Sequence, residues 1–227
     1  MLEELIKNNV ESLKANISSA SESEPMIVAV SKKKSVDHIL AALNQGINNF
    51  GENYAAELAE KAQSINANAV WHFIGPIQSN KTKTIASFAT WVHSVERIKI
   101  AERLSKHRPR YADDLNICIQ VNVDFEDSKS GVSSKDLMDL CLAIKDLPKI
   151  KLRGLMCIPK IRFEHELQRK PFKAIKNLLV DLNENNFDMD TLSMGMTDDF
   201  KAAIQEGSTI IRIGTVSYTH LTLPTKA

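Results

Sequence analysis

The sequence has too few cysteines for a disulfide framework or a structural zinc site. Only Cys118, Cys141 and Cys157 occur among the 227 residues, and no pair has Cys-x-x-Cys spacing. An odd count with this spacing argues against both kinds of cross-link and indicates a reducing compartment. No pattern of His, Asp or Glu resembles a metal-ligand set. We therefore expect no metal and a cytoplasmic location.

Net charge of one sign and long apolar runs are also scarce. The chain carries a net charge of +1 and shows no clustered basic face, so we expect no nucleic-acid partner. Residues 1–6 contain acids where a signal peptide would carry bases, and no apolar run approaches the length of a membrane span. We expect no membrane association and an intracellular protein.

What the sequence does contain is a regular alternation of short apolar runs and helical patterns, within an ordinary globular composition of 43% hydrophobic residues. The predicted strands cover residues 26–32, 47–53, 70–75, 90–95, 115–123, 152–159, 190–194 and 208–214. The predicted helices cover residues 1–19, 36–43, 54–65, 81–88, 98–104, 134–146, 172–183 and 200–205. Strict alternation predicts a parallel sheet, and eight strands favour a closed (β/α)8 TIM barrel preceded by an N-terminal helix. An open Rossmann sheet would show Gly-x-Gly-x-x-Gly after its first strand, and none is present.

No internal linker divides the chain, so we predict one domain over residues 1–215. Residues 216–227 lack a helical period and resemble the read-through peptides of mis-assembled reading frames. We expect this tail to be non-native and the true C-terminus to be missing.

The first predicted strand ends in a lysine of chemical interest. Alternation places Val28, Val30 and Lys32 on one side of the strand. Functional groups of such barrels lie at the C-terminal ends of the strands, and a lysine held in a pocket there is a nucleophile toward aldehydes. Lys33 and Lys34 are the neighbouring cations that would help to lower its pKa. The alternative is a solvated basic strand end.

Two glycine-containing loops follow the seventh and eighth predicted strands, where barrels commonly bind phosphate. Gly195 and Gly214 would let the backbone approach an anion, and Ser193 and Thr215 would add hydroxyl donors. The alternative is a pair of ordinary turns, with Thr197 or Asp198 capping a helix.

Arg212 is flanked by isoleucines on the last strand and requires a partner, because an unpaired buried charge is costly. A guanidinium only donates hydrogen bonds, so a ring nitrogen with a free lone pair would satisfy it. The alternative is a structural salt bridge to Asp190 or Glu206. An imine-forming lysine, an anion cradle and this arginine together describe a pyridoxal phosphate (PLP) site.

Several longer motifs carry a resemblance to a known family. They are AVSK (29–32), FGENY (50–54), WHFIGPIQSNK (71–81), HSV (93–95), SKSG (128–131), RGLM (153–156), SMGMTDD (193–199) and RIGT (212–215). Together they resemble the pyridoxal phosphate homeostasis proteins, single-domain relatives of the alanine racemase N-terminal barrel. A departure is Lys33-Lys34-Ser35, where the family commonly has Thr-Lys-Pro.

The resemblance implies a site and a function. Lys32 would form the Schiff base and Arg212 would face the pyridine nitrogen. The phosphate would lie against Ser193, Gly214 and Thr215, with Asn53 near the cofactor. The protein would bind PLP and hand it over, with PLP-dependent apoenzymes as partners, without turning over a substrate. We expect a monomer.

Physical reasoning also favours a carrier over an enzyme. An arginine against the ring nitrogen leaves that nitrogen unprotonated and weakens the ring as an electron sink. Racemisation needs acid–base groups on both faces of the substrate carbon, and by the resemblance one of these comes from a second domain in the racemases. The rival hypotheses are a Schiff-base aldolase or phosphosugar-handling barrel, and a non-binding fragment. We interpret His72 and His93 as packed, hydrogen-bonded side chains rather than ligands.

Overall fold

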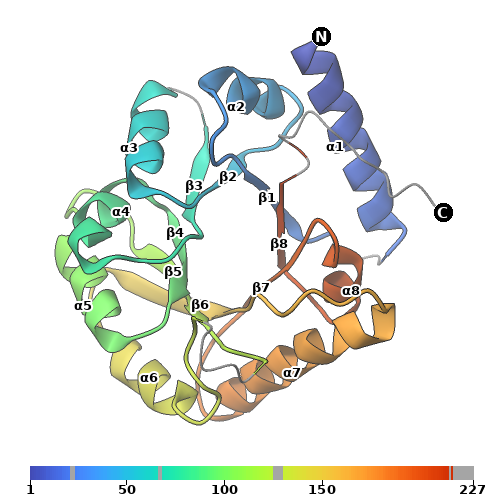
Figure 1. The fold of residues 1–227 in the computed structure, drawn as a ribbon. Coiled ribbons are helices and arrows are strands. Elements are labelled where there is room, and N and C mark those ends of the chain that lie inside the picture. Colours follow the sequence, from blue (N-terminus) through green and yellow to red (C-terminus); the bar gives the residue numbers. More distant parts are fainter. Residues whose placement is uncertain (21–23, 66–67, 125–129, 215, 217–227) are drawn as a thin grey trace.

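Eight parallel strands close into a barrel in which neighbours in sequence are neighbours in space, and the last strand pairs with the first (Figure 1). The computed structural model describes residues 1–20, 24–65, 68–124, 130–214 and 216. The strands are β1 (Met26–Val30), β2 (Asn49–Glu52), β3 (Val70–Phe73), β4 (Trp91–Val95), β5 (Leu115–Gln120), β6 (Ile150–Met156), β7 (Thr191–Met196) and β8 (Ile210–Ile213). The predicted (β/α)8 barrel is confirmed.

Helices surround the barrel, and one precedes the first strand (Figure 1). They are α1 (Leu2–Ser18), α2 (Val36–Leu43), α3 (Ala55–Ser64), α4 (Thr82–Phe88), α5 (Ile98–His107), α6 (Leu137–Ile144), α7 (His165–Glu184) and α8 (Phe200–Gln205), with a 3-10 turn at Ser79–Lys81. The amphipathic pattern of α1 buries Ile6, Val10, Leu13 and Ile17. No helix in the described ranges is long and apolar enough to cross a bilayer.

The largest departure from the predicted boundaries lies in α7. Helix α7 begins at His165 rather than at residue 172, with Pro171 inside it. Its first turns, residues 165–170, contain good helix formers but are mostly exposed, so they show no apolar period. Strand β5 ends at Gln120 instead of residue 123.

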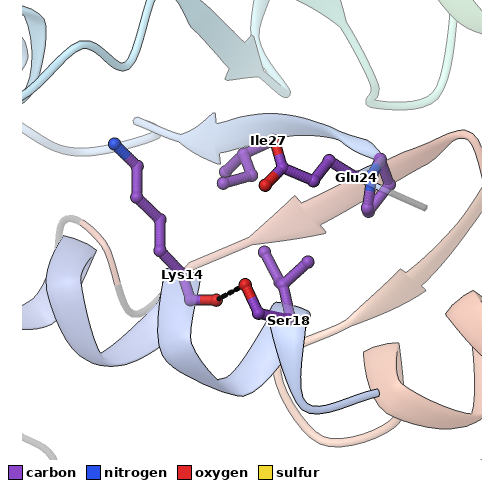
Figure 2. Close-up of a pocket in the computed structure, with 6 residues that line it drawn as sticks. Lys14, Ser18, Glu24 and Ile27 are labelled. Carbon is purple, nitrogen blue, oxygen red and sulfur yellow. Dashed lines mark hydrogen bonds between the residues drawn. The ribbon is translucent and has the colours of Figure 1, made fainter. Parts of the chain in front are cut away.

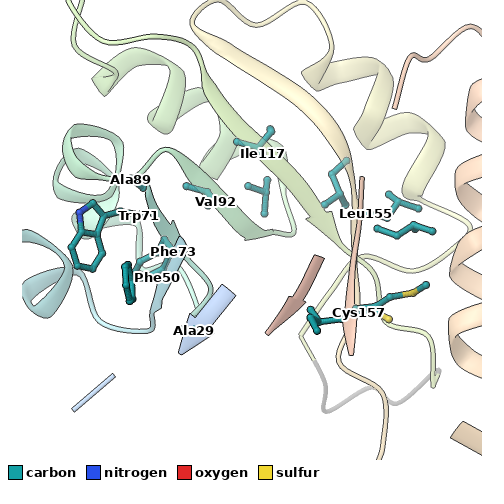
Figure 3. Packing of buried hydrophobic residues seen from close by; sticks show 14 of the residues in the cluster. Ala29, Phe50, Trp71, Phe73, Ala89, Val92, Ile117, Leu155 and Cys157 are labelled. Carbon is teal, nitrogen blue, oxygen red and sulfur yellow. The ribbon is translucent and has the colours of Figure 1, made fainter. Parts of the chain in front are cut away.

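Side chains alternate between two layers of packing. Val28, Trp91, Cys118, Met156 and Ile210 form a small buried cluster on the inward parity of the strands. Their outward neighbours, which include Ala29, Phe50, Val92, Ile117 and Leu155, belong to the large cluster between strands and helices (Figure 3). Val28 therefore lies on the inward side of β1, which the alternation alone did not decide.

The predicted domain boundary lies at the end of the described chain. Val216 is 1% exposed and packs in the large core cluster. Residues 217–227 lie outside the described residues, so the non-native tail stays a prediction.

Candidate functional site

Lys32 follows β1 after Ser31, at the end of the barrel where the carboxyl ends of the parallel strands meet. It lies in a tight turn with Lys33 and is partly buried. The described part of the chain offers its amine no hydrogen-bond or ion-pair partner. A partly buried amine without a carboxylate partner keeps its lone pair available to an electrophile once it is deprotonated.

Arg212 is almost completely buried, at 3% exposure, on the strand next to β1, where it pairs in register with Val28. Its Nη1 donates to the carbonyl oxygen and to Oγ of Ser193, both at 2.7 Å. Its Nη2 donates to the carbonyl oxygen of Cys157 at 2.9 Å. All three acceptors are uncharged. The guanidinium is therefore held by dipoles from two neighbouring segments.

The two carboxylates that we considered as partners of Arg212 bind other arginines. Asp190 pairs with Arg153 through Oδ2 at 2.5 Å, and Glu206 pairs with Arg169 at 2.7 Å. The predicted alternative of a structural salt bridge to either residue is therefore wrong.

The remaining donors of Arg212 fit an additional acceptor. The contacts to Ser193 and Cys157 leave N–H groups on Nε and Nη2 without a partner among the described residues. A buried cation with spare donors and no carboxylate is suited to a neutral lone pair such as a ring nitrogen.

A chain of hydrogen bonds runs from Arg212 through the barrel interior to β2. Ser193 Oγ lies 2.7 Å from His93 Nδ1, His93 Nε2 lies 2.9 Å from His72 Nδ1, and His72 Nε2 lies 3.0 Å from Asn49 Oδ1. The Asn49 oxygen accepts, so the proton of His72 is on Nε2 and its Nδ1 accepts from His93 Nε2–H. His93 Nδ1 must then accept from the Ser193 hydroxyl, which leaves that oxygen free to accept from Arg212. The donors therefore run in one direction along the whole chain.

Both histidines are neutral in this chain. Burial lowers the pKa of His72 to about 3. Burial, together with His72 and the charge of Arg212, lowers the pKa of His93 well below its ordinary value. The interpretation of both residues as packed, hydrogen-bonded histidines is confirmed. The sequence did not reveal their connection to Ser193, because His93 and Ser193 are 100 residues apart and no local pattern relates them.

The predicted phosphate residues have different surroundings. Ser193 is fully buried and its hydroxyl links Arg212 to His93. Gly195 has a φ of +95°, and a Cβ there would lie 2.7 Å from Ala203 Cβ and 3.0 Å from Phe200 Cα of α8. The glycine is thus required for close packing of β7 on α8. Gly214 follows β8 and is partly buried, and Thr215 lies outside the described residues. A phosphate contact of these four residues stays a prediction.

Asn53 lies on the same rim, directly after β2. It lines a cavity of about 340 Å³ with Phe73, Gln78, Lys81 and Glu96, among others. The backbone of Asn53 lies where a Cβ at position 75 would be, so Gly75 is needed for this approach. The rim cavity thus opens beside a predicted cofactor residue.

A second cavity, of about 260 Å³, lies at the other end of β1. It is lined by Lys14, Ser18, Glu24 and Ile27, among others, and the Ser18 hydroxyl in it bonds to the Lys14 carbonyl oxygen at 3.1 Å (Figure 2). Ile27 is near the start of β1 whereas Lys32 follows its end, so this cavity is separate from the candidate site. The described residues contain no group of His, Cys, Asp and Glu side chains that could hold a metal ion.

Sequence reasoning missed a buried ionic cluster beside Lys32. Lys61 of α3 is 6% exposed and binds Glu52 of β2 at 2.7 Å and Glu57 at 2.9 Å. The available signal was helical spacing, because Lys61 follows Ala55 and Leu58 on the buried face of the helix.

Comparisons with known proteins agree with this geometry. The model of the alanine racemase N-terminal domain matches residues 3–221. A pyridoxal phosphate homeostasis protein of Pseudomonas aeruginosa is 50% identical over 193 residues, which cover 85% of this chain and 83% of that protein. A second pyridoxal phosphate homeostasis protein, from Pasteurella multocida, is 43% identical, and the match covers 94% of this chain and 96% of that protein.

A solved structure is also similar. PipY of Synechococcus elongatus, solved with PLP bound, superposes with a TM-score of 0.83 at 27% identity, and the match covers 94% of this chain and 99% of that one. The family model matches residues 3–221 of the chain, and the two relatives are 50% and 43% identical to it. The chain therefore belongs to the pyridoxal phosphate homeostasis proteins, built on the alanine racemase N-terminal domain.

Proposed function

We propose that this protein binds PLP as a Schiff base on Lys32 and serves in intracellular PLP homeostasis or delivery, without turning over a substrate. The observation that carries the proposal is Lys32, a partly buried residue whose amine has no partner among the described residues. It lies at the end of β1, and Arg212, which keeps donors without a partner among the described residues, lies on the neighbouring strand β8.

The residues present fit the chemistry of this cofactor. Condensation would join the Lys32 nitrogen to the aldehyde carbon and release one molecule of water. Arg212 would donate to the ring nitrogen, and the backbone after β7 and β8 would receive the phosphate, with Gly195, Gly214, Thr215 and the Ser193 segment nearby. Asn53 would border the cofactor from β2. The PLP-bound PipY structure supports this assignment through its similarity to the chain.

Arg212 also supports binding without turnover. It is a donor held by uncharged acceptors, and the side chain that links to it through Ser193 is the neutral His93. A ring nitrogen that accepts from it stays unprotonated, and an unprotonated ring withdraws electrons weakly from a substrate carbon. The relatives are named for homeostasis rather than for a reaction, which is consistent with this role.

Borohydride reduction tests the proposal. The purified protein is incubated with PLP, reduced and digested, and the labelled peptide is mapped. We expect the label on Lys32, its loss in Lys32→Ala, and an unchanged yield in the matched control Lys83→Ala, an exposed lysine of α4. Label absent from Lys32 in the folded wild-type protein would refute the proposal. Trapping of a phosphosugar, but not PLP, would instead support the aldolase-like alternative.

The absence of turnover is tested separately. The loaded protein is incubated with L-alanine, and D-alanine is measured against free PLP at the same concentration. We expect equal rates. A faster rate that disappears in Lys32→Ala would show that the protein is an enzyme. Apoenzyme partners, a monomeric state and a cytoplasmic location remain predictions.

A further inference from the structure

The backbone on both sides of Lys32 is held from outside the barrel by a single buried cluster. The Lys61 ammonium donates to the Ser31 carbonyl oxygen at 2.7 Å, to Glu52 Oε1 at 2.7 Å and to Glu57 Oε2 at 2.9 Å. Each N–H of the ammonium therefore has an acceptor. One of these acceptors is the main chain of the residue before Lys32.

The residue after Lys32 is anchored to the same cluster. The Lys33 backbone N–H donates to Glu57 Oε2 at 2.7 Å, and the Ser31 hydroxyl donates to Glu52 Oε1 at 2.6 Å. Glu57 thus accepts from both Lys61 and Lys33. Glu52 is fully buried, and its other oxygen, Oε2, has no partner in the described part of the chain. The two carboxylates are therefore coupled through the shared Lys61 ammonium, with Glu52 buried and Glu57 28% exposed.

The segment held in this way has an unfavourable backbone conformation. The Lys34 N–H donates to the Ser31 carbonyl oxygen at 3.0 Å, which closes a turn with Lys32 and Lys33 at its centre. Lys33 has a φ of +59°, in a turn position that usually selects glycine. Such strain persists only where the surroundings impose it, and it is concentrated at functional sites. Glu57 binds the backbone N–H of Lys33.

We propose that Lys61, Glu52 and Glu57 are positioning residues that hold the Lys32 turn so that the Lys32 amine stays at the mouth of the barrel. This inference rests on the proposed function, because a fixed position of the Lys32 amine matters only if that amine reacts with PLP. The cluster contacts the main chain at Ser31 and Lys33 and leaves the Lys32 amine itself free. It therefore controls geometry and does not share in the chemistry. Without it, the turn relaxes and Lys33 and Lys34 compete for the aldehyde.

The test compares Glu57→Ala with Glu60→Ala. Both residues are glutamates of α3, so the two substitutions change helix propensity and charge alike. They differ in that the Glu60 side chain is exposed. The rate of Schiff-base formation with PLP is followed by the growth of its absorbance band. The reduced label is then mapped among Lys32, Lys33 and Lys34.

We expect Glu57→Ala to react roughly tenfold more slowly or worse, since small misplacement of a reacting group is costly. We also expect its label to spread to Lys33 and Lys34 and the circular dichroism of the bound chromophore to weaken. Glu60→Ala should match the wild type. Lys61→Met should behave as Glu57→Ala does, and Glu57→Gln, which keeps an acceptor for the Lys33 N–H, should recover part of the rate.

The outcomes separate this inference from the proposed function. If the wild-type protein forms no Schiff base on Lys32, the proposed function fails. If it does, and Glu57→Ala and Lys61→Met react at the wild-type rate with the label confined to Lys32, the positioning role fails. Thermal unfolding identifies any variant that does not fold, and Glu57→Gln then decides: a wild-type label pattern at a reduced rate supports the role, and an unchanged rate overturns it.

Discussion

At the scale of single residues, the least expected feature is a buried arginine whose hydrogen-bond partners among the described residues are all uncharged. Arg212 is held by Ser193 and by the main chain of Cys157, and Ser193 is held in turn by His93. Each contact between two side chains of this hydrogen-bonded chain joins one donor to one acceptor. Removal of one member therefore leaves its neighbours buried and unsatisfied.

Replacement of Ser193 by alanine should show this dependence. We expect Ser193→Ala to lower the free energy of unfolding by about 1–3 kcal/mol, because Arg212 Nη1 and His93 Nδ1 both lose a partner. Urea unfolding measures the change. The control is Ser64→Ala, an exposed serine whose hydroxyl bonds within α3, and it should change stability by less than about 0.5 kcal/mol. Equal effects of the two changes would contradict the coupling.

At the scale of elements, the contact between β7 and α8 shapes the phosphate side of the proposed site. Gly195 combines a left-handed backbone with a position against Phe200 and Ala203. A glycine predicted for anion binding is therefore also required by helix packing. The positive φ and the close approach to α8 occur at one residue near the end of β7, and glycine meets both requirements without strain.

The packing component can be measured against a matched glycine. Gly46 has a similar φ of +79°, but a Cβ there would meet nothing within 4 Å. We expect Gly46→Ala to cost about 1 kcal/mol, from backbone strain alone. We expect Gly195→Ala to cost roughly 2 kcal/mol more, because α8 must move. Chemical denaturation gives both values, and equal losses would show that α8 accommodates the extra methyl group.

At the scale of the whole molecule, the closed barrel removes two imidazoles from water. His72 and His93 are fully buried and neutral, one stacked on Trp91, whose ring also packs against the Arg153 guanidinium. A closed interior leaves no route by which either ring can be solvated when protonated. The fold as a whole therefore resists their titration.

This resistance makes stability depend on pH. The folded pKa of His72, about 3, lies below the value of 6.5 for an exposed histidine. The unfolded chain therefore binds more protons as the pH falls below that value. The histidine contribution is complete above about pH 6.5 and is lost progressively as the pH falls toward 3. We expect a loss of roughly 1.4 kcal/mol per pH unit for each buried histidine below that point.

Urea unfolding at several pH values between 7.5 and 5.0 tests this expectation before most carboxylates titrate. His165→Gln, which removes a half-exposed histidine, should keep the wild-type slope. His93→Gln should be less stable at pH 7.5 but show a shallower slope. A wild-type stability that stays constant from pH 7 to 5 would contradict the neutral, buried pair.

Much of the architecture was readable from local pattern. Apolar runs predicted the strands, and helical periods predicted the helices, with the largest error at the polar first turns of α7. Alternation put Val28 and Lys32 on the same side of the first strand, and the place of Lys32 at the end of that strand put it at the rim. The motifs around Lys32 and Arg212 pointed to the family to which the chain belongs.

The sequence by itself determined the elements, their order and the end of the barrel that carries the chemistry, because these depend on neighbours a few residues apart. Only the tertiary structure decided which side chains meet. Two sets of contacts depend on how the strands are staggered as the barrel closes. One is the hydrogen-bonded chain from Arg212 through Ser193 and His93 to His72, and the other is the contact of Lys61 with the turn at Lys32. Strand stagger is set by the closure of the whole sheet, and no local period records it.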